Sequence, residues 1–206
     1  MEYHYLQEPL DAYVKKVADR TPCPGGGSVA ALAAALSCAL AGMVGNFTRG
    51  KKGYEAVQEE IASILAEESV LRERLAFLVE EDSAVYGRIR ETPKEDAGGQ
   101  KRLLKESALL HIEIAESALR ILRMNEILLA KGNRFLLSDV GISAVLAGAA
   151  LRSARVNVAV NMSYLDDAAF TAERTARLDM LEREALDIER RIYRETMDRL
   201  SAKSRE

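Results

Sequence analysis

The sequence predicts an all-α protein, a single-domain bundle of about six long helices that is dimeric. No segment alternates apolar and polar residues with the period of two that strands require. The chain has 13 Gly and 4 Pro in 206 residues, so turn formers are few and the elements between them are long. Apolar residues make up 48% of the chain, which is enough for one sizeable core. We therefore treat residues 1–206 as one helical domain.

Apolar residues recur at helical spacing in six segments, separated by turn formers. Ser28 and Ser138 are candidate N-caps for the second and fifth helices. Pro93 and Gly98 lie in the break between the third and fourth, and Gly132 ends the fourth. The expected helices are residues 6–18, 28–47, 54–91, 101–131, 139–162 and 167–201.

Two of these segments are uncharged or nearly so. Residues 21–48 contain no charged residue, and residues 140–162 contain only Arg152 and Arg155. A helix that is apolar all round must be buried on all sides. The two helices are therefore either a central pair wrapped by amphipathic helices or a surface buried against a second subunit, most simply in a two-fold homodimer. Residues 28–47 are long enough to cross a membrane, but they are mostly Ala, Gly and Ser, so we expect an interior helix and no membrane contact.

Charge and composition exclude several classes of function. The net charge is −3 and the basic residues are dispersed, which argues against a nucleic-acid partner. Two cysteines, Cys23 and Cys38, and two histidines, His4 and His111, form no metal-binding motif, so we expect no metal. We expect His111, in a stretch rich in Leu and Ile, to be structural. The N-terminal segment is charged and does not resemble a signal peptide, which favours a cytoplasmic protein with reduced thiols.

The first candidate site is a glycine segment, Gly25, Gly26 and Gly27, followed by Ser28 and a helix. Free amides and the helix dipole at such a start favour a carboxylate or phosphate. The segment matches neither a Walker A loop nor a dinucleotide fingerprint. The alternative is a flexible loop with an N-cap, although the two flanking prolines stiffen it.

A basic turn follows the second helix and contains Lys51 and Lys52. Positive charge at a helix C-terminus is ordinary dipole complementation, and it can also bind an anionic ligand. A helix over residues 28–47 would separate this turn from the glycine segment by about 30 Å. One subunit would then not bring both to one ligand, whereas an antiparallel dimer would.

Asp82 is the most informative single residue. It continues the apolar stripe of Leu75, Leu78 and Val79, where a Leu would be expected. A carboxylate withdrawn from water holds a proton more readily unless a cation or hydrogen-bond donors compensate, which is one way to make a general acid. The alternatives are a buried Asp paired with an Arg or a helix end, and Glu68 on the same stripe is a rival for the acid.

The fifth expected helix carries polar residues roughly along one side. Two of them, Asn157 and Asn161, lie one turn apart on an otherwise apolar helix. Such a pair can hydrogen-bond a flat polar heterocycle or bridge two helices, and the pattern does not decide between these. The polar residues are Asp139, Ser143, Ser153, Asn157 and Asn161.

Four stretches together resemble a known family. They are residues 21–31 (TPCPGGGSVAA), 50–54 (GKKGY), 81–82 (ED) and 138–141 (SDVG). In this order and spacing, they are similar to the cyclodeaminase/cyclohydrolase family of folate enzymes, and the resemblance covers nearly the whole chain. It implies an all-helical domain, a dimer, a tetrahydrofolate ligand and neither a metal nor another cofactor.

The resemblance also implies roles for particular residues. It makes Asp82 the proton donor, while Cys23 departs from the small residue or Thr expected there. The resemblance covers two reactions, and a chain with only the helical domain favours hydrolysis of 5,10-methenyltetrahydrofolate to 10-formyltetrahydrofolate. The alternatives are a formimidoyltetrahydrofolate cyclodeaminase that releases ammonia, and a non-catalytic folate-binding or scaffold dimer. The expected substrate-binding residues are Gly25, Gly26, Gly27, Ser28, Lys51, Lys52, Asp139, Asn157 and Asn161.

Overall fold

The computed structural model describes residues 3–203, and every regular element in that range is helical. Six α-helices confirm the predicted fold class. Three short 3₁₀ turns accompany them: η1 (Tyr5–Gln7), η2 (Glu55–Val57) and η3 (Arg134–Leu136). The α-helices are α1 (Leu10–Ala18), α2 (Gly26–Thr48), α3 (Gln58–Glu91), α4 (Ala97–Lys131), α5 (Leu137–Ser163) and α6 (Ala168–Lys203).

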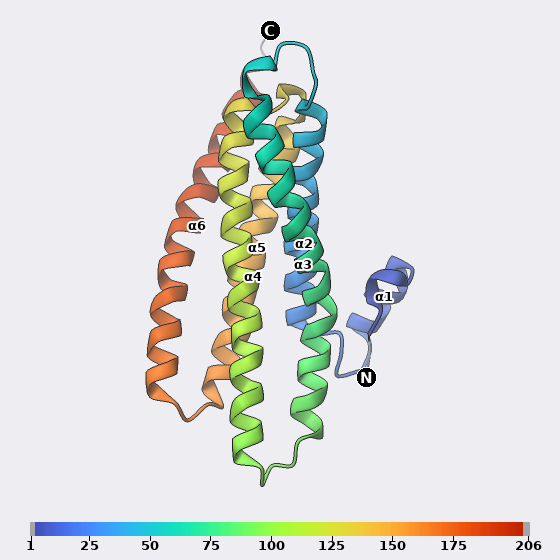
Figure 1. Ribbon diagram of the computed structural model, residues 1–206, viewed down its shortest axis with the longest axis vertical. Helices are drawn as coiled ribbons and strands as arrows, with labels where there is room; N and C mark the ends of the chain where they lie inside the picture. Colours follow the sequence, from blue (N-terminus) through green and yellow to red (C-terminus); the bar gives the residue numbers. More distant parts are fainter. Residues whose placement is uncertain (1–2, 204–206) are drawn as a thin grey trace.

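The five long helices run alternately up and down the bundle, and α1 stands to one side of them (Figure 1). Helix α2 packs against α3, α4 and α5, and α6 flanks α4 and α5. Helix α1 begins later than the expected 6–18. Of its apolar residues only Tyr13 is buried, while Leu10, Val14 and Val17 are exposed. The expected apolar side of this helix is therefore not covered within one chain.

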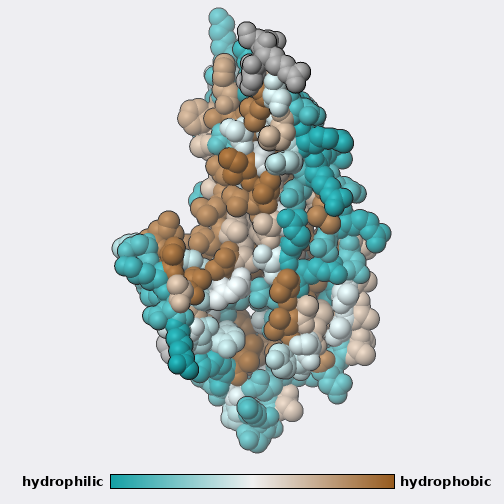
Figure 2. All heavy atoms as spheres, turned by 180° about the vertical axis from the view of Figure 1, so that it is seen from behind, coloured by the Kyte–Doolittle hydropathy of each residue, from teal (hydrophilic) through white to brown (hydrophobic). Residues whose placement is uncertain are grey.

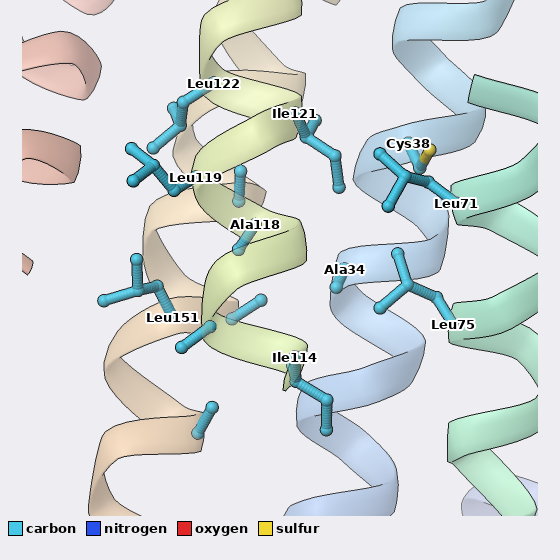
Figure 3. Packing of buried hydrophobic residues seen from close by; sticks show 14 of the residues in the cluster. Ala34, Cys38, Leu71, Leu75, Ile114, Ala118, Leu119, Ile121, Leu122 and Leu151 are labelled. Carbon is cyan, nitrogen blue, oxygen red and sulfur yellow. The ribbon is translucent and has the colours of Figure 1, made fainter. Parts of the chain in front are cut away.

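Small side chains on α2 let its neighbours approach closely. Ala34 and Cys38 are fully buried, and Leu71 and Leu75 of α3 point toward them (Figure 3). The α4 side chain Ile114 is fully buried in the same layer. Burial raises the pKa of the Cys38 thiol to about 12, so this thiol stays protonated and serves as a small apolar group.

Helices α2 and α5 are not a central pair, which corrects one of the two sequence-based alternatives. They pack against each other, but a strip along both of them remains exposed. We call this strip the open apolar face; Figure 2 shows its hydrophobic side chains in the middle of the bundle, with polar surface beside it. With only α3, α4 and α6 as long partners, one chain has no helix left to cover it. The exposed side chains are Val29, Leu36 and Phe47 on α2 and Ile142, Val145, Val156 and Val160 on α5.

Helix α2 and the segment Arg134–Ser163 are long and apolar enough to cross a membrane by length and composition alone. In their most apolar stretches, 56% and 50% of the residues are buried within the bundle. Core helices of water-soluble proteins show the same properties. The absence of a membrane partner therefore stays a prediction.

Neither predicted serine cap is used. Gly25 is the N-cap of α2, so Ser28 lies inside its first turn. Helix α5 continues directly from η3 with Leu136 at its N-cap position, so Ser138 also lies inside the helix. In both cases the helix begins before the serine that was expected to cap it.

Candidate active site

Asp82 of α3 lies at the N-terminus of α2. The Ser28 amide, in the first turn of α2, donates a hydrogen bond of 2.9 Å to Asp82 Oδ2. A carboxylate from another helix thus satisfies an amide that has no partner within its own helix, and the α2 dipole stabilises its negative charge. The Asp82 side chain is 14% exposed, so it is sheltered from solvent but can still be reached.

Gly27 makes room for this arrangement. A Cβ atom on Gly27 would lie 2.1 Å from Asp82 Oδ1 and 2.3 Å from His111 Nε2, well inside van der Waals contact. Only a residue without a side chain lets α3 and α4 place these groups against the start of α2. The last residue of the glycine segment therefore has a steric role in the site.

His111 of α4 lies beside the other oxygen of the Asp82 carboxylate, the one that does not accept the Ser28 amide. Its Nδ1 lies 2.7 Å from the Ser107 carbonyl oxygen, and its Nε2 lies 3.0 Å from Asp82 Oδ1. The side chain is only 4% exposed. A hydrogen on Nε2 would not point straight at Oδ1, so Nε2 has no aligned hydrogen-bond partner among residues 3–203. The sequence reasoning missed this contact; the only signal was a titratable residue on a buried helix face.

Two further groups line the site from the N-terminal side. The hydroxyls of Tyr13 and Ser28 are 3.0 Å apart. The Cys23 thiol makes a weak contact of 3.9 Å with the Ser83 carbonyl. Burial, with a smaller effect from the Asp82 charge, raises the pKa of both Tyr13 and Cys23. Cys23 is therefore not an activated thiolate.

The two asparagines of α5 lie at the same end of the bundle as Asp82. Asn161 donates to the Ser107 hydroxyl at 2.9 Å, which connects α5 to the turn of α4 that supports His111. Asn157 donates to the Ser153 carbonyl at 3.1 Å, and its amide faces Gly26. The structure thus gives Asn161 a helix-bridging contact and places Asn157 beside the glycine segment.

Three predicted site residues lie at the other end. Lys51 is stacked over the Phe135 ring of η3, with its Nζ 5.4 Å from the ring centroid, and Lys52 is exposed beside it. Asp139 lies in the first turn of α5, directly after η3. The 23 residues of α2 separate these groups from Asp82 by about 35 Å. As expected, one chain does not bring the basic turn to the glycine segment.

The rival carboxylate is already paired. Glu68 is buried, and its Oε1 accepts a hydrogen bond of 2.7 Å from Arg72 Nε. It packs against Gly42 in the middle of α2, far from the helix start. Among the described residues, no group of three or more His, Cys, Asp and Glu side chains is arranged to hold a metal ion. Of the two carboxylates, only Asp82 lies at a helix start, as one of the sequence-based alternatives expected, and beside a histidine.

The fold and site together define a class of protein: an antiparallel helical bundle in which a carboxylate and a histidine from two helices lie against the start of a third. Comparison with known families makes the assignment specific. The family model described as formiminotransferase-cyclodeaminase matches residues 9–180, and the chain belongs to this family.

Individual relatives agree with the family. A methenyltetrahydrofolate cyclohydrolase of Methylorubrum extorquens is 33% identical over 196 residues, which is 90% of this chain and 94% of that protein. A formimidoyltransferase-cyclodeaminase of Sus scrofa is 27% identical over 89% of this chain but only 36% of its own length. The crystal structure of formiminotetrahydrofolate cyclodeaminase from Thermotoga maritima matches with a TM-score of 0.91 and 29% identity, covering 96% of this chain and all of that one.

Proposed function

We propose that this one-carbon folate enzyme hydrolyses 5,10-methenyltetrahydrofolate to 10-formyltetrahydrofolate, with Asp82 as the general acid. The observation that carries the proposal is a sheltered carboxylate held by the Ser28 amide and flanked by His111. The match to a cyclohydrolase of nearly the same length supports this choice of reaction. We expect a cytoplasmic enzyme with no cofactor beyond its folate substrate.

The chemistry needs one well-placed proton donor. Water attacks the one-carbon bridge of the substrate, and N5 must receive a proton as its bond to that carbon breaks. Asp82 is the more exposed member of its pair with His111, so it is the group that a substrate would meet. Asn157 and Asn161 at the same end would orient the pterin by hydrogen bonds.

The remaining predicted residues fit a dimer. We propose that the open apolar face pairs two chains in antiparallel fashion, which would bring the basic turn of one chain toward Asp82 of the other. Lys51 and Lys52 would then bind the glutamate carboxylates of folate, with Asp139 beside them. The exposed apolar residues of α1, α2 and α5 support this pairing, because a face of this kind is unusual on a monomer.

The alternative reaction is the cyclodeaminase one, in which N10 attacks the formimino carbon and ammonia leaves. The close fold match to a cyclodeaminase that this chain covers completely favours it. It needs the same proton donor in the same place. The two reactions therefore differ in their substrate, and an assay with both substrates distinguishes them.

The test follows the absorbance of 5,10-methenyltetrahydrofolate with purified protein, beside a reaction with 5-formimidoyltetrahydrofolate. We expect enzyme-dependent loss of the methenyl signal, and Asp82→Asn should lower kcat by about 10²–10⁴-fold with little change in KM. Appearance of the methenyl signal with ammonia would establish the cyclodeaminase instead. If neither signal changes and no reduced folate raises the melting temperature, the protein is a non-catalytic scaffold.

The basic turn has its own test. Replacing Lys51 and Lys52 together with Ala should raise KM for a polyglutamylated folate more than for the monoglutamate, because only the longer tail presents extra carboxylates. Steady-state kinetics with both substrates measure this difference. Equal effects on the two KM values would exclude the assignment.

A further inference from the structure

We infer that the contact of Asp82 Oδ1 with His111 Nε2 holds one proton in the resting protein, and that Nε2 of His111 carries it. His111 is then a positioning residue that keeps Asp82 ionised, so that Asp82 accepts a proton before it donates one. The use of this proton in catalysis rests on the proposed function. The number of protons in the pair is independent of the proposed function, since it follows from the contacts of the two side chains.

The contacts of the imidazole fix its protonation at one nitrogen. Nδ1 lies 2.7 Å from the Ser107 carbonyl oxygen, which can only accept, so Nδ1 carries a hydrogen. The other nitrogen lies 3.0 Å from Asp82 Oδ1. An unprotonated Nε2 would set an electron-rich nitrogen against a carboxylate oxygen at that distance, so one hydrogen must lie on one of the two atoms.

The surroundings of Asp82 favour His111 as the proton carrier. Asp82 Oδ2 accepts the Ser28 amide at the start of α2, and both the hydrogen bond and the helix dipole stabilise a negative charge. The other titratable groups that face Asp82 are Tyr13 of α1 and Cys23 before α2; burial raises the pKa of both, which keeps them neutral.

The poor alignment of the Nε2–Oδ1 contact has a functional meaning. The two atoms are within ion-pair distance, yet the hydrogen on Nε2 does not point at Oδ1. Hydrogen bonds of catalytic groups are often loose without substrate and tighten when it binds. Asp82 Oδ1 thus remains free to receive a proton from a second partner.

An ionised Asp82 serves both halves of the hydrolysis. The water oxygen bonds to the bridge carbon, and one water proton passes to Asp82. The bond from that carbon to N5 then breaks, its electron pair stays on N5, and N5 takes the proton from Asp82. The remaining hydroxyl proton goes to solvent as the formyl carbonyl forms. Asp82 ends as the carboxylate it began as, and His111 keeps its proton throughout.

The proton count can be measured without any substrate. The chain has two histidines, so His4→Gln leaves His111 as the only imidazole in a two-bond ¹H–¹⁵N spectrum of labelled protein. At neutral pH we expect both His111 nitrogens to be protonated, and Asp82→Asn in the same background to leave a hydrogen on Nδ1 alone. A bare Nε2 with Asp82 present, or an unchanged spectrum in the variant, would overturn the inference.

Kinetics with two substitutions then separate positioning from structure. In His111→Gln the amide nitrogen can replace Nε2 toward Asp82, and in His111→Asn it can replace Nδ1 toward the Ser107 carbonyl. We expect His111→Gln to retain at least about tenfold more kcat than His111→Asn, with a similar KM. The reverse order would assign His111 a structural role only.

A double variant completes the test. His111 acts through Asp82, so Asp82→Asn with His111→Asn should be no more than about threefold slower than Asp82→Asn alone. If the kcat losses of the two single variants multiply in the double variant, His111 does not act through Asp82. Suppose that the wild-type protein turns over no folate while the spectrum still shows both His111 nitrogens protonated. In that case the proposed function fails and the proton assignment stands.

Discussion

Replacement of Gly27 by Ala tests the site most directly. The new Cβ would lie 2.1 Å from Asp82 Oδ1 and 2.5 Å from Asp82 Cγ, where ordinary contacts begin near 3.4 Å. Asp82 must therefore move by more than about 1 Å, which breaks its hydrogen bond to Ser28. A displacement of this size at a catalytic group lowers the rate by about 10²-fold.

The loss of stability from Gly27→Ala is expected to be too small to unfold the protein. Overpacking costs about 1–3 kcal/mol, and the better helix propensity of Ala returns up to about 1 kcal/mol. The net loss is therefore about 0–3 kcal/mol, which thermal unfolding followed by circular dichroism measures. We expect a folded protein with kcat about 10²-fold lower in the methenyltetrahydrofolate assay.

Two glycines provide controls for this variant. Gly98 occupies the equivalent second position of α4, and a Cβ there meets Asp96 at an ordinary 3.7 Å, so Gly98→Ala should leave both stability and kcat nearly unchanged. Gly42→Ala forces a Cβ to within 2.6 Å of Glu68 Cδ and should destabilise the core without touching Asp82. If Gly27→Ala retains kcat within about threefold of the wild type, the steric argument for the site is wrong.

Two further predictions concern association and acid stability. Val156 is 64% exposed on the open apolar face, so Val156→Glu should convert the proposed dimer to a monomer while the helices stay folded. Sedimentation experiments measure this change. A wild-type monomer, or a variant that remains a dimer, would refute the pairing. Hydrogen bonds, that from Lys105 foremost, hold the pKa of Asp167 below its ordinary value. Because the pKa is lower in the folded protein, the ionised Asp167 stabilises the fold above about pH 4, and this contribution is lost as the pH falls further. Asp167→Asn should therefore weaken the decline of the melting temperature in acid. An identical decline in the variant and the wild type would exclude the effect.

Helical periodicity in the sequence was sufficient to predict the number of α-helices and their order. The starts of the helices were harder to predict, because helical periodicity does not locate a cap and the cap of α2 comes from a distant residue. Asp82 caps α2 from α3, so the helix begins without using Ser28 as a cap. Asp96 is the local N-cap of α4 and accepts the Gly99 amide at 2.8 Å, so Gly98, where a break was expected, lies inside α4.

The candidate site was predictable only in part. The apolar stripe of α3 correctly indicated that Asp82 faces the bundle. One turn further along the helix the stripe no longer predicts burial, since Tyr86 is exposed while Ser83 is fully buried. The buried side drifts around a helix of this length. The contact of Asp82 with His111 depends on how α3 and α4 are aligned after their turn. No residue pattern within either helix encodes that alignment. The contacts of Lys51 and Lys52 with a ligand remain a prediction, since they require a second chain.

The hydrogen bond from Ser28 to Asp82 joins residues 54 positions apart, whereas the helices themselves form through contacts four residues apart. The acidic group is thus placed only after α2, α3 and α4 have docked correctly. A loosened bundle can keep its helices and lose this placement. Turnover would then monitor the docking of the helices, and circular dichroism would monitor only their presence.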